Sequence, residues 1–216
     1  MEYVDERIAL LEREKRRQKR EEEEKSIADA GQQEKEGAGE AMTLEEMLVA
    51  VREGSVVFPN KEKFDLEIRN YFEDGIPMVL ISHIYTGVQE DEAVAIFVDH
   101  DRNISQILTV SDKKMGKDSI GKWKKQLTDG MKMSGTYAEV TKEAVLENLD
   151  YLTFRTPTGK GWVYNIIFRI RSGSSRVVGN YNCFEKDKDT YGLMLEALTL
   201  RLNELIAEPA TPVEGE

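Results

Sequence analysis

The chain of 216 residues carries 30 basic and 41 acidic side chains, so its net charge is -11, and its hydrophobic content of 40% can supply one folded domain plus extensions. The acidic balance argues against a general nucleic-acid binder. The single cysteine, Cys183, excludes an internal disulfide framework and indicates a reducing compartment. No apolar run approaches the roughly 20 residues of a membrane-spanning helix, and the N-terminus lacks a secretory pattern. We therefore expect a cytoplasmic protein.

The composition along the chain predicts three regions. Residues 1–41 form a charged helical arm and linker, in which Val4, Ile8 and Leu11 make one short apolar stripe. A coiled coil needs about three apolar heptads, and this arm has one. Residues 42–206 carry the apolar periodicity of a folded α+β domain, and residues 207–216 read as a disordered tail. The arm is interpreted as a docking helix, as a basic recognition tag, or as a solvated, frayed helix.

The folded domain is predicted to start with a helix and an ambiguous segment. Thr43 and Glu46 have the spacing of a capping box, which predicts a helix from Leu44 to Glu53. In the following stretch Phe64 to Phe72, "FDLEIRNYF", the apolar residues fit both a helical period and a strand alternation. The local sequence alone leaves both readings open.

The rest of the domain is predicted to contain several strands and two helices. Ser119 is the expected N-cap of a helix whose apolar stripe includes Trp123, and leucines spaced four and three residues apart predict a closing helix over 191–205. Predicted strands cover Met78–Tyr85, Ala93–Val98, Ile104–Val110, Tyr137–Val140, Leu149–Thr156, Trp162–Ile170 and Arg176–Phe184. The expected fold is an antiparallel sheet of about six strands flanked by helices, an α/β/α sandwich. A chain ending near Asp189 should not fold.

Two basic segments lie within this acidic chain. Residues 113–132 hold seven lysines and two aspartates, and residues 151–184 hold five basic residues and no acid, so each has a net charge of +5. If they meet in space, they form a surface for an anionic partner; the other reading is that they pair with the acids of the same chain. The candidate surface consists of Lys122, Lys124, Lys125, Arg155, Arg169, Arg171 and Arg176.

The remaining candidate chemistry is sparse. Asp99, His100 and Asp101, together with His83 from a neighbouring predicted strand, could hold a metal, but an Asp-His-Asp cluster more often caps a turn. Cys183 lies in a predicted strand, where a small buried thiol is common, rather than beside a base. We therefore predict no catalytic residue, no metal site and no cofactor. A small hydrolase that uses carboxylates remains an alternative.

Two polar features of the predicted domain remain open to more than one reading. Asn180 and Asn182 should share one side of the last strand, where they could bind a polar partner or cap the end of the sheet. Trp123, surrounded by lysines, could stack on a nucleic-acid base, but its place on the apolar stripe favours the core.

The order of elements resembles the PsbP/DcrB-like α/β/α fold. The residues that carry the likeness are "FDLEIRNYFEDGIPMVLIS", "RNISQILTV", "DSIGKWKKQL", "LDYLTFRT" and "WVYNIIFRI" with the closing helix. The resemblance implies that the ambiguous stretch is a strand from about Phe64 to Arg69. It also implies a non-enzymatic binding protein, and one cytoplasmic branch of this fold, the effector-associated chaperones of type VI secretion, cradles apolar helices of a toxin before export.

The functional expectation is a non-catalytic protein-binding module, such as an adaptor or a chaperone of a secreted effector. It would bind its partner through a sheet face or through the basic surface. The alternatives are a binder of an anionic ligand or nucleic acid through residues 113–132 and 151–184, and the small hydrolase.

Overall fold

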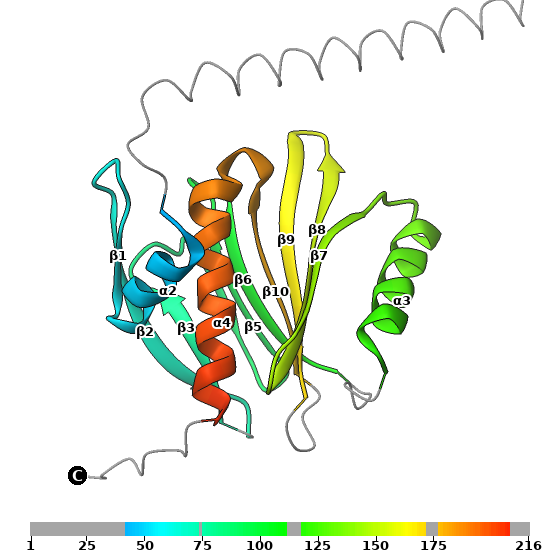
Figure 1. Ribbon diagram of the computed structural model, residues 1–216, viewed down its shortest axis with the longest axis horizontal. Helices are drawn as coiled ribbons and strands as arrows, with labels where there is room; N and C mark the ends of the chain where they lie inside the picture. Colours follow the sequence, from blue (N-terminus) through cyan, green and yellow to red (C-terminus); the bar gives the residue numbers. More distant parts are fainter. Residues whose placement is uncertain (1–41, 74, 112–117, 172–176, 208–216) are drawn as a thin grey trace, which may run out of the picture. The chain divides into compact units, whose positions relative to one another are not determined.

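The computed structural model describes residues 42–73, 75–111, 118–171 and 177–207, and in them the chain adopts an α+β fold (Figure 1). The described residues form three α-helices and two antiparallel sheets. The helices are α2 (Leu44–Arg52), α3 (Ile120–Met133) and α4 (Leu193–Ala207). The predicted arm, residues 1–41, lies outside the described residues, as does the predicted tail apart from Ala207.

The small sheet has the order β1-β2-β3 and the large sheet has the order β4-β5-β6-β10-β9-β8-β7. The small sheet consists of β1 (Ser55–Val57), β2 (Lys63–Tyr71) and β3 (Ile76–Ile81). The large sheet consists of β4 (Gly87–Glu90), β5 (Val94–Asp99), β6 (Ile104–Val110), β7 (Glu139–Val145), β8 (Leu149–Thr158), β9 (Gly161–Ile170) and β10 (Val177–Phe184). All strand pairs among the described residues are antiparallel, as expected for strands that are mostly joined by short turns.

The start of α2 confirms the predicted capping box. The Thr43 hydroxyl accepts a hydrogen bond from the Glu46 N–H at 3.3 Å, and the Glu46 carboxylate accepts one from the Thr43 N–H at 2.8 Å. These two bonds satisfy donors that the first turn of a helix leaves without intrahelical partners. Gly54 follows the C-cap with a φ of 84°, a conformation that glycine adopts without steric cost.

The ambiguous stretch forms β2, which confirms the predicted strand. Strand pairing decides the question, because β2 forms backbone ladders with β1 on one side and β3 on the other, with Phe64 opposite Val56 and Leu66 opposite Ile81. The side chain of Phe64 is buried, and its ring packs edge-on against the Phe58 and Tyr191 rings at 5.7 and 6.0 Å between centroids. These long-range contacts are invisible to a local pattern.

One face of the large sheet is covered by α4, and the core lies between them. Along β10 the burial alternates, and the buried set Val177, Gly179, Tyr181 and Cys183 faces this core. Leu195, Leu198 and Leu202 of the predicted leucine stripe are fully buried there, together with Met194. The helix α4 also packs on α2 and β3, so it joins the two sheets (Figure 1).

The opposite face of the large sheet carries α3 (Figure 1). Ser119 caps α3, since its hydroxyl accepts a hydrogen bond from the Lys122 N–H at 3.3 Å. Trp123 is 4% exposed and faces the sheet, which confirms its predicted place in the core. Beneath α3 lie the buried side chains of Asp150, Leu152 and Phe154 on β8.

The structure differs from the prediction in the number of sheets and in several boundaries. Two sheets replace the single sheet of about six strands; β1 and β4 are short strands at sheet edges, with little periodicity to detect. The strand predicted over 137–140 runs from Glu139 to Val145. His83, predicted within a strand, lies in the turn that follows β3, with a φ of 62°.

A candidate binding face and pocket on the large sheet

Part of the large sheet on the α3 side is only partly buried by the described residues, and we call this region the open face. It is formed by outward-facing side chains of β5, β6, β10 and β9, each of which keeps part of its surface accessible. The open face consists of Val94, Ile96, Val98, Ile107, Thr109, Val163, Ile167, Val178, Asn180 and Asn182. By contrast, the side chains of β8 on the same side of the sheet are buried beneath α3.

The register of the strands arranges the open face in rows. One row places Ile96 opposite Ile107, Ile107 opposite Asn180, and Asn180 opposite Ile167. The next row toward the β5–β6 turn places Val98 opposite Ser105 and Ser105 opposite Asn182. The open face is therefore a largely aliphatic surface with a short line of uncharged polar side chains along its middle.

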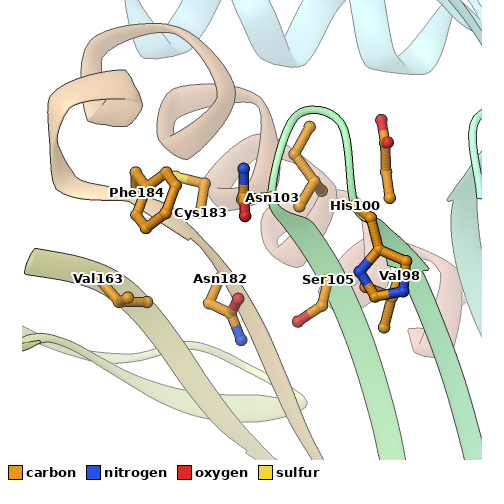
Figure 2. A pocket seen from close by; sticks show the side chains of 10 residues that line it. Val98, His100, Asn103, Ser105, Val163, Asn182, Cys183 and Phe184 are labelled. Atoms are coloured by element: carbon orange, nitrogen blue, oxygen red, sulfur yellow. The ribbon is translucent and has the colours of Figure 1, made fainter. Parts of the chain in front are cut away.

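A pocket of about 260 Å³ lies at one end of the open face (Figure 2). Its apolar lining includes Val98, Val163 and Phe184, and its other side chains come from β5, β6, β10 and the β5–β6 turn. The remaining lining residues are Asp99, His100, Asn103, Ile104, Ser105, Asn182 and Cys183. Figure 2 shows the Ser105 hydroxyl and the Asn182 amide turned toward each other between β6 and β10, in agreement with their direct pairing in the register.

The turn that supplies His100 and Asn103 is held rigidly by Asp99. Oδ1 of the buried Asp99 accepts hydrogen bonds from the N–H groups of Asp101 and Arg102 at 2.9 and 3.4 Å, while Oδ2 accepts one from the Arg102 guanidinium at 2.9 Å. Arg102 also donates to Glu62 at 2.7 Å. Such side-chain-to-backbone bonds fix a turn in one conformation.

Contacts and backbone conformation at both ends of the β5–β6 turn also hold it in one conformation. The His100 N–H donates to the Thr86 hydroxyl at 3.2 Å, and Asn103 has a φ of 54°, a left-handed conformation in which asparagine is enriched. The expected capping role of the Asp-His-Asp cluster is confirmed for Asp99. Within the described residues no group of three or more His, Cys, Asp or Glu side chains is arranged to hold a metal ion.

One polar atom of the open face lacks a hydrogen-bond partner among the described residues. Oδ1 of Asn180 is shielded from solvent and has no hydrogen-bond partner among them. Asn180 and Asn182 both point away from the α4 side, as the alternation of β10 predicted. The pocket itself was not predicted, because its residues come from four strands and a turn that the fold brings together; the polar Ser105 within the apolar β6 was its main local signal.

Cys183 lines the pocket, but its thiol is not suited to act as a nucleophile. Its side chain is buried, and burial together with the nearby carboxylates of Asp187 and Glu185 raises the pKa of its thiol above the ordinary value. A raised pKa keeps the sulfur protonated at neutral pH and weakens it as a nucleophile. This agrees with the predicted buried thiol.

The described arginines of the predicted basic surface form ion pairs with acidic residues of the same chain. Arg169 is 2% exposed and binds Asp150 at 2.7 Å, so it does not reach the surface. Arg171 lies 3.4 Å from the same carboxylate, and Arg155 lies 2.9 Å from Glu139.

The lysines of α3 are more exposed than these arginines. Lys122 pairs with Asp118 at 2.7 Å, Lys124 lies 3.9 Å from Glu143, and Lys125 is exposed on the helix. Arg176 lies outside the described residues. The pairing that was the alternative reading of these segments therefore holds for most of the described members.

Comparisons with known proteins found similarity to solved structures alone. No family model and no curated protein matches it. Ten solved chains match in structure; one of them is a protein of unknown function from Pseudomonas aeruginosa, with 8% sequence identity, a TM-score of 0.43, and coverage of 67% of this chain and 99% of that one. A likeness of this size supports no conclusion about this chain. None of the described helices is long and apolar enough to cross a membrane.

Proposed function

We propose that this protein is a non-catalytic cytoplasmic protein-binding module, and that its open face binds one apolar helix of a partner protein. The observation that carries the proposal is the contrast between the two halves of one sheet face. The half beneath α3 is buried, whereas the half formed by β5, β6, β10 and β9 presents aliphatic side chains that the described residues leave partly accessible. Contiguous apolar surface that stays partly accessible commonly marks an interaction site.

The dimensions of the open face suit a single helix. Neighbouring strands lie about 4.8 Å apart, so four strands span about 14 Å, and a helix with its side chains is about 10–12 Å wide. From Val178 to Phe184 the strand advances about 20 Å at about 3.3 Å per residue, which matches a helix of about 13 residues. The neighbouring α3 already shows that this sheet face accepts a helix.

The chemistry of the open face indicates which side of the partner helix would contact it. None of its side chains carries a formal charge, and seven of the ten are valine or isoleucine. A charged side chain placed there would lose its hydration without a compensating partner. The proposed partner therefore presents an apolar face, and a chaperone or adaptor of a secreted effector is one function that this chemistry would serve.

Site-specific photo-crosslinking in the source cell tests this proposal with the full chain. A photoreactive phenylalanine analogue replaces Ile107 at the centre of the open face, and a matched control replaces Val57, an exposed strand residue of the small sheet. We expect position 107 to crosslink to an apolar segment of another protein and position 57 not to do so. Crosslinks from position 107 that map only to this chain, or equal crosslinking from both positions, would contradict the proposal.

A further inference from the structure

We propose that the pocket at the end of the open face recognises one uncharged hydrogen-bonding side chain, a carboxamide, on the segment that binds the open face. This inference rests on the proposed function and adds a specificity determinant to it. Its principal contacts are assigned to Ser105 and Asn182, with the aliphatic part of the bound side chain against Val98, Val163 and Phe184.

The pocket and the open face share residues, so one bound segment reaches both. Val98, Val163 and Asn182 belong to the open face and also line the pocket. Asn182 lies two residues from Phe184 along β10, and alternate residues of a strand point to the same side. A helix that lies along β6 and β10 therefore places a side chain from its end at the mouth of the pocket.

The charge of the lining selects a neutral group. Asp99 is the one carboxylate in the lining, and both of its oxygens are occupied by the turn and by Arg102. The other hydrogen-bonding side chains that reach the pocket are neutral amides, a hydroxyl and a histidine. An ammonium or carboxylate in this pocket would give up hydration without gaining a free counter-charge.

The hydrogen-bonding capacity of the lining favours a carboxamide over a hydrocarbon. The Ser105 hydroxyl and the Asn182 amide can each donate and accept, and the register places these two residues opposite each other on β6 and β10. A carboxamide also donates and accepts, so it can satisfy both groups at once. A purely apolar side chain would cover these groups without satisfying them, which costs free energy.

The size and the rigidity of the pocket agree with a single side chain. A volume of about 260 Å³ is smaller than the roughly 300–1,000 Å³ of pockets that hold drug-sized ligands. The β5–β6 turn is already fixed by Asp99, Arg102 and Thr86, so binding requires little ordering of the lining. Groups held in place before binding lose less entropy when a ligand arrives.

Model helices provide the probe, because the natural partner is not identified. Fluorescein-labelled peptides of about 20 residues, built from leucine and alanine with solubilising lysines at both ends, carry glutamine, leucine or glutamate at one position near either end. Their affinity for the full chain is measured by fluorescence anisotropy in 150 mM salt and again in 500 mM salt. Binding that persists at high salt is not due to attraction between the lysines and the acidic protein.

We expect the glutamine peptide to bind about tenfold more tightly than the leucine peptide, which corresponds to about one to two hydrogen bonds, and the glutamate peptide to bind more weakly than both. Asn182→Ala and Ser105→Ala should each remove most of this preference, while the affinity for the leucine peptide stays within about twofold. Asn70→Ala, an exposed strand asparagine of the small sheet, is the matched control and should change neither affinity. Thermal melting of each variant verifies that it is folded.

The outcomes separate the two proposals. Binding that is lost in Ile107→Lys but shows no preference for glutamine over leucine would overturn the pocket assignment and leave the open face as the binding site. Equal weakening of all peptides by Asn182→Ala would overturn it as well. If no peptide binds in a manner that depends on Ile107, both the open-face proposal and the pocket assignment are wrong.

Discussion

The guanidinium carbon of Arg169 lies 4.7 Å from the centre of the Trp123 ring, on the side of the large sheet that carries α3. Arg169 also donates to the backbone carbonyl of Asp118, next to the N-cap of α3. A cation stacked on an indole ring is stabilised by the electrons of the ring, most strongly where water is excluded. This pair fastens α3 to the sheet and so forms the boundary of the open face.

The first prediction concerns this attachment. Trp123→Ala removes a buried ring and uncovers Arg169, so we expect the free energy of unfolding to fall by about 3–5 kcal/mol. Urea denaturation measures the loss, and Lys125→Ala on the exposed side of the same helix should change stability by less than about 0.5 kcal/mol. A Trp123→Ala protein within about 1 kcal/mol of the wild type would show that α3 contributes little to the fold.

The second prediction concerns the ion pair beneath α3. Asp150 and Arg169 are both almost fully buried, and their side chains meet at 2.7 Å. Asp150→Ala leaves the arginine charge buried and without its partner, which should cost about 3–5 kcal/mol. The double substitution Asp150→Leu with Arg169→Met removes both charges and should recover most of that loss, as equilibrium unfolding would measure. A double variant no more stable than Asp150→Ala would argue against the buried charge as the cause.

The third prediction concerns Gly179, whose α-carbon lies directly against the ring of Phe168 in the core. A Cβ atom on Gly179 would lie 2.0 Å from Cζ of Phe168, on the neighbouring strand β9. Gly179→Ala therefore forces the ring to move, and we expect a loss of about 3 kcal/mol or more in the free energy of unfolding.

A companion substitution identifies the clash as the cause. Phe168→Leu should offset part of the effect of Gly179→Ala, so the double variant loses less stability than the sum of the two single variants. Gly121→Ala is the control, because its added Cβ meets no atom within 4 Å and lies in α3, where alanine is favoured by up to about 1 kcal/mol. Strict additivity in the double-mutant cycle would contradict the assigned clash.

The fourth prediction concerns the dependence of stability on pH. Burial raises the pKa of the Glu185 carboxyl above its ordinary value of 4.5, although Lys188 and Arg155 act in the opposite direction. The folded state thus holds this proton more tightly than the unfolded chain. Well below pH 4.5 the Glu185 carboxyl is protonated in both the folded and the unfolded state, so the folded protein buries no negative charge there. As the pH rises through the raised pKa of the folded state, the buried carboxyl must ionise, and the stability that the bound proton contributed is lost.

A neutral side chain at this position should remove that loss. We expect Glu185→Gln to melt at a higher temperature than the wild type at pH 7, with the difference shrinking toward pH 4. Glu92→Gln, on an exposed turn, provides the control and should show no such trend. A difference in melting temperature that is constant between pH 4 and pH 7 would mean that the glutamine acts through packing instead.

Much of the secondary structure could be predicted from the local sequence wherever one capping or periodicity pattern was clear. The capping box of Thr43 and Glu46 located α2, Ser119 located the start of α3, and the alternation from Trp162 to Ile170 located β9. These signals are local, because capping and side-chain periodicity depend on residues only a few positions apart. The identity of β2 was different: its apolar residues fitted two periods, and pairing with β1 and β3 selected the strand.

Local patterns were enough to predict an α+β domain with a leucine-rich closing helix, and to place Asn180 and Asn182 on one side of a strand. The tertiary structure alone decided that the apolar residues of β5, β6, β10 and β9 form an open face, that Ser105 and Asn182 meet in a pocket, and that Arg169 is buried against Asp150 rather than displayed. The reason is physical. Periodicity reports which side of an element is apolar, whereas exposure and pairing depend on what the chain brings against that side from distant positions.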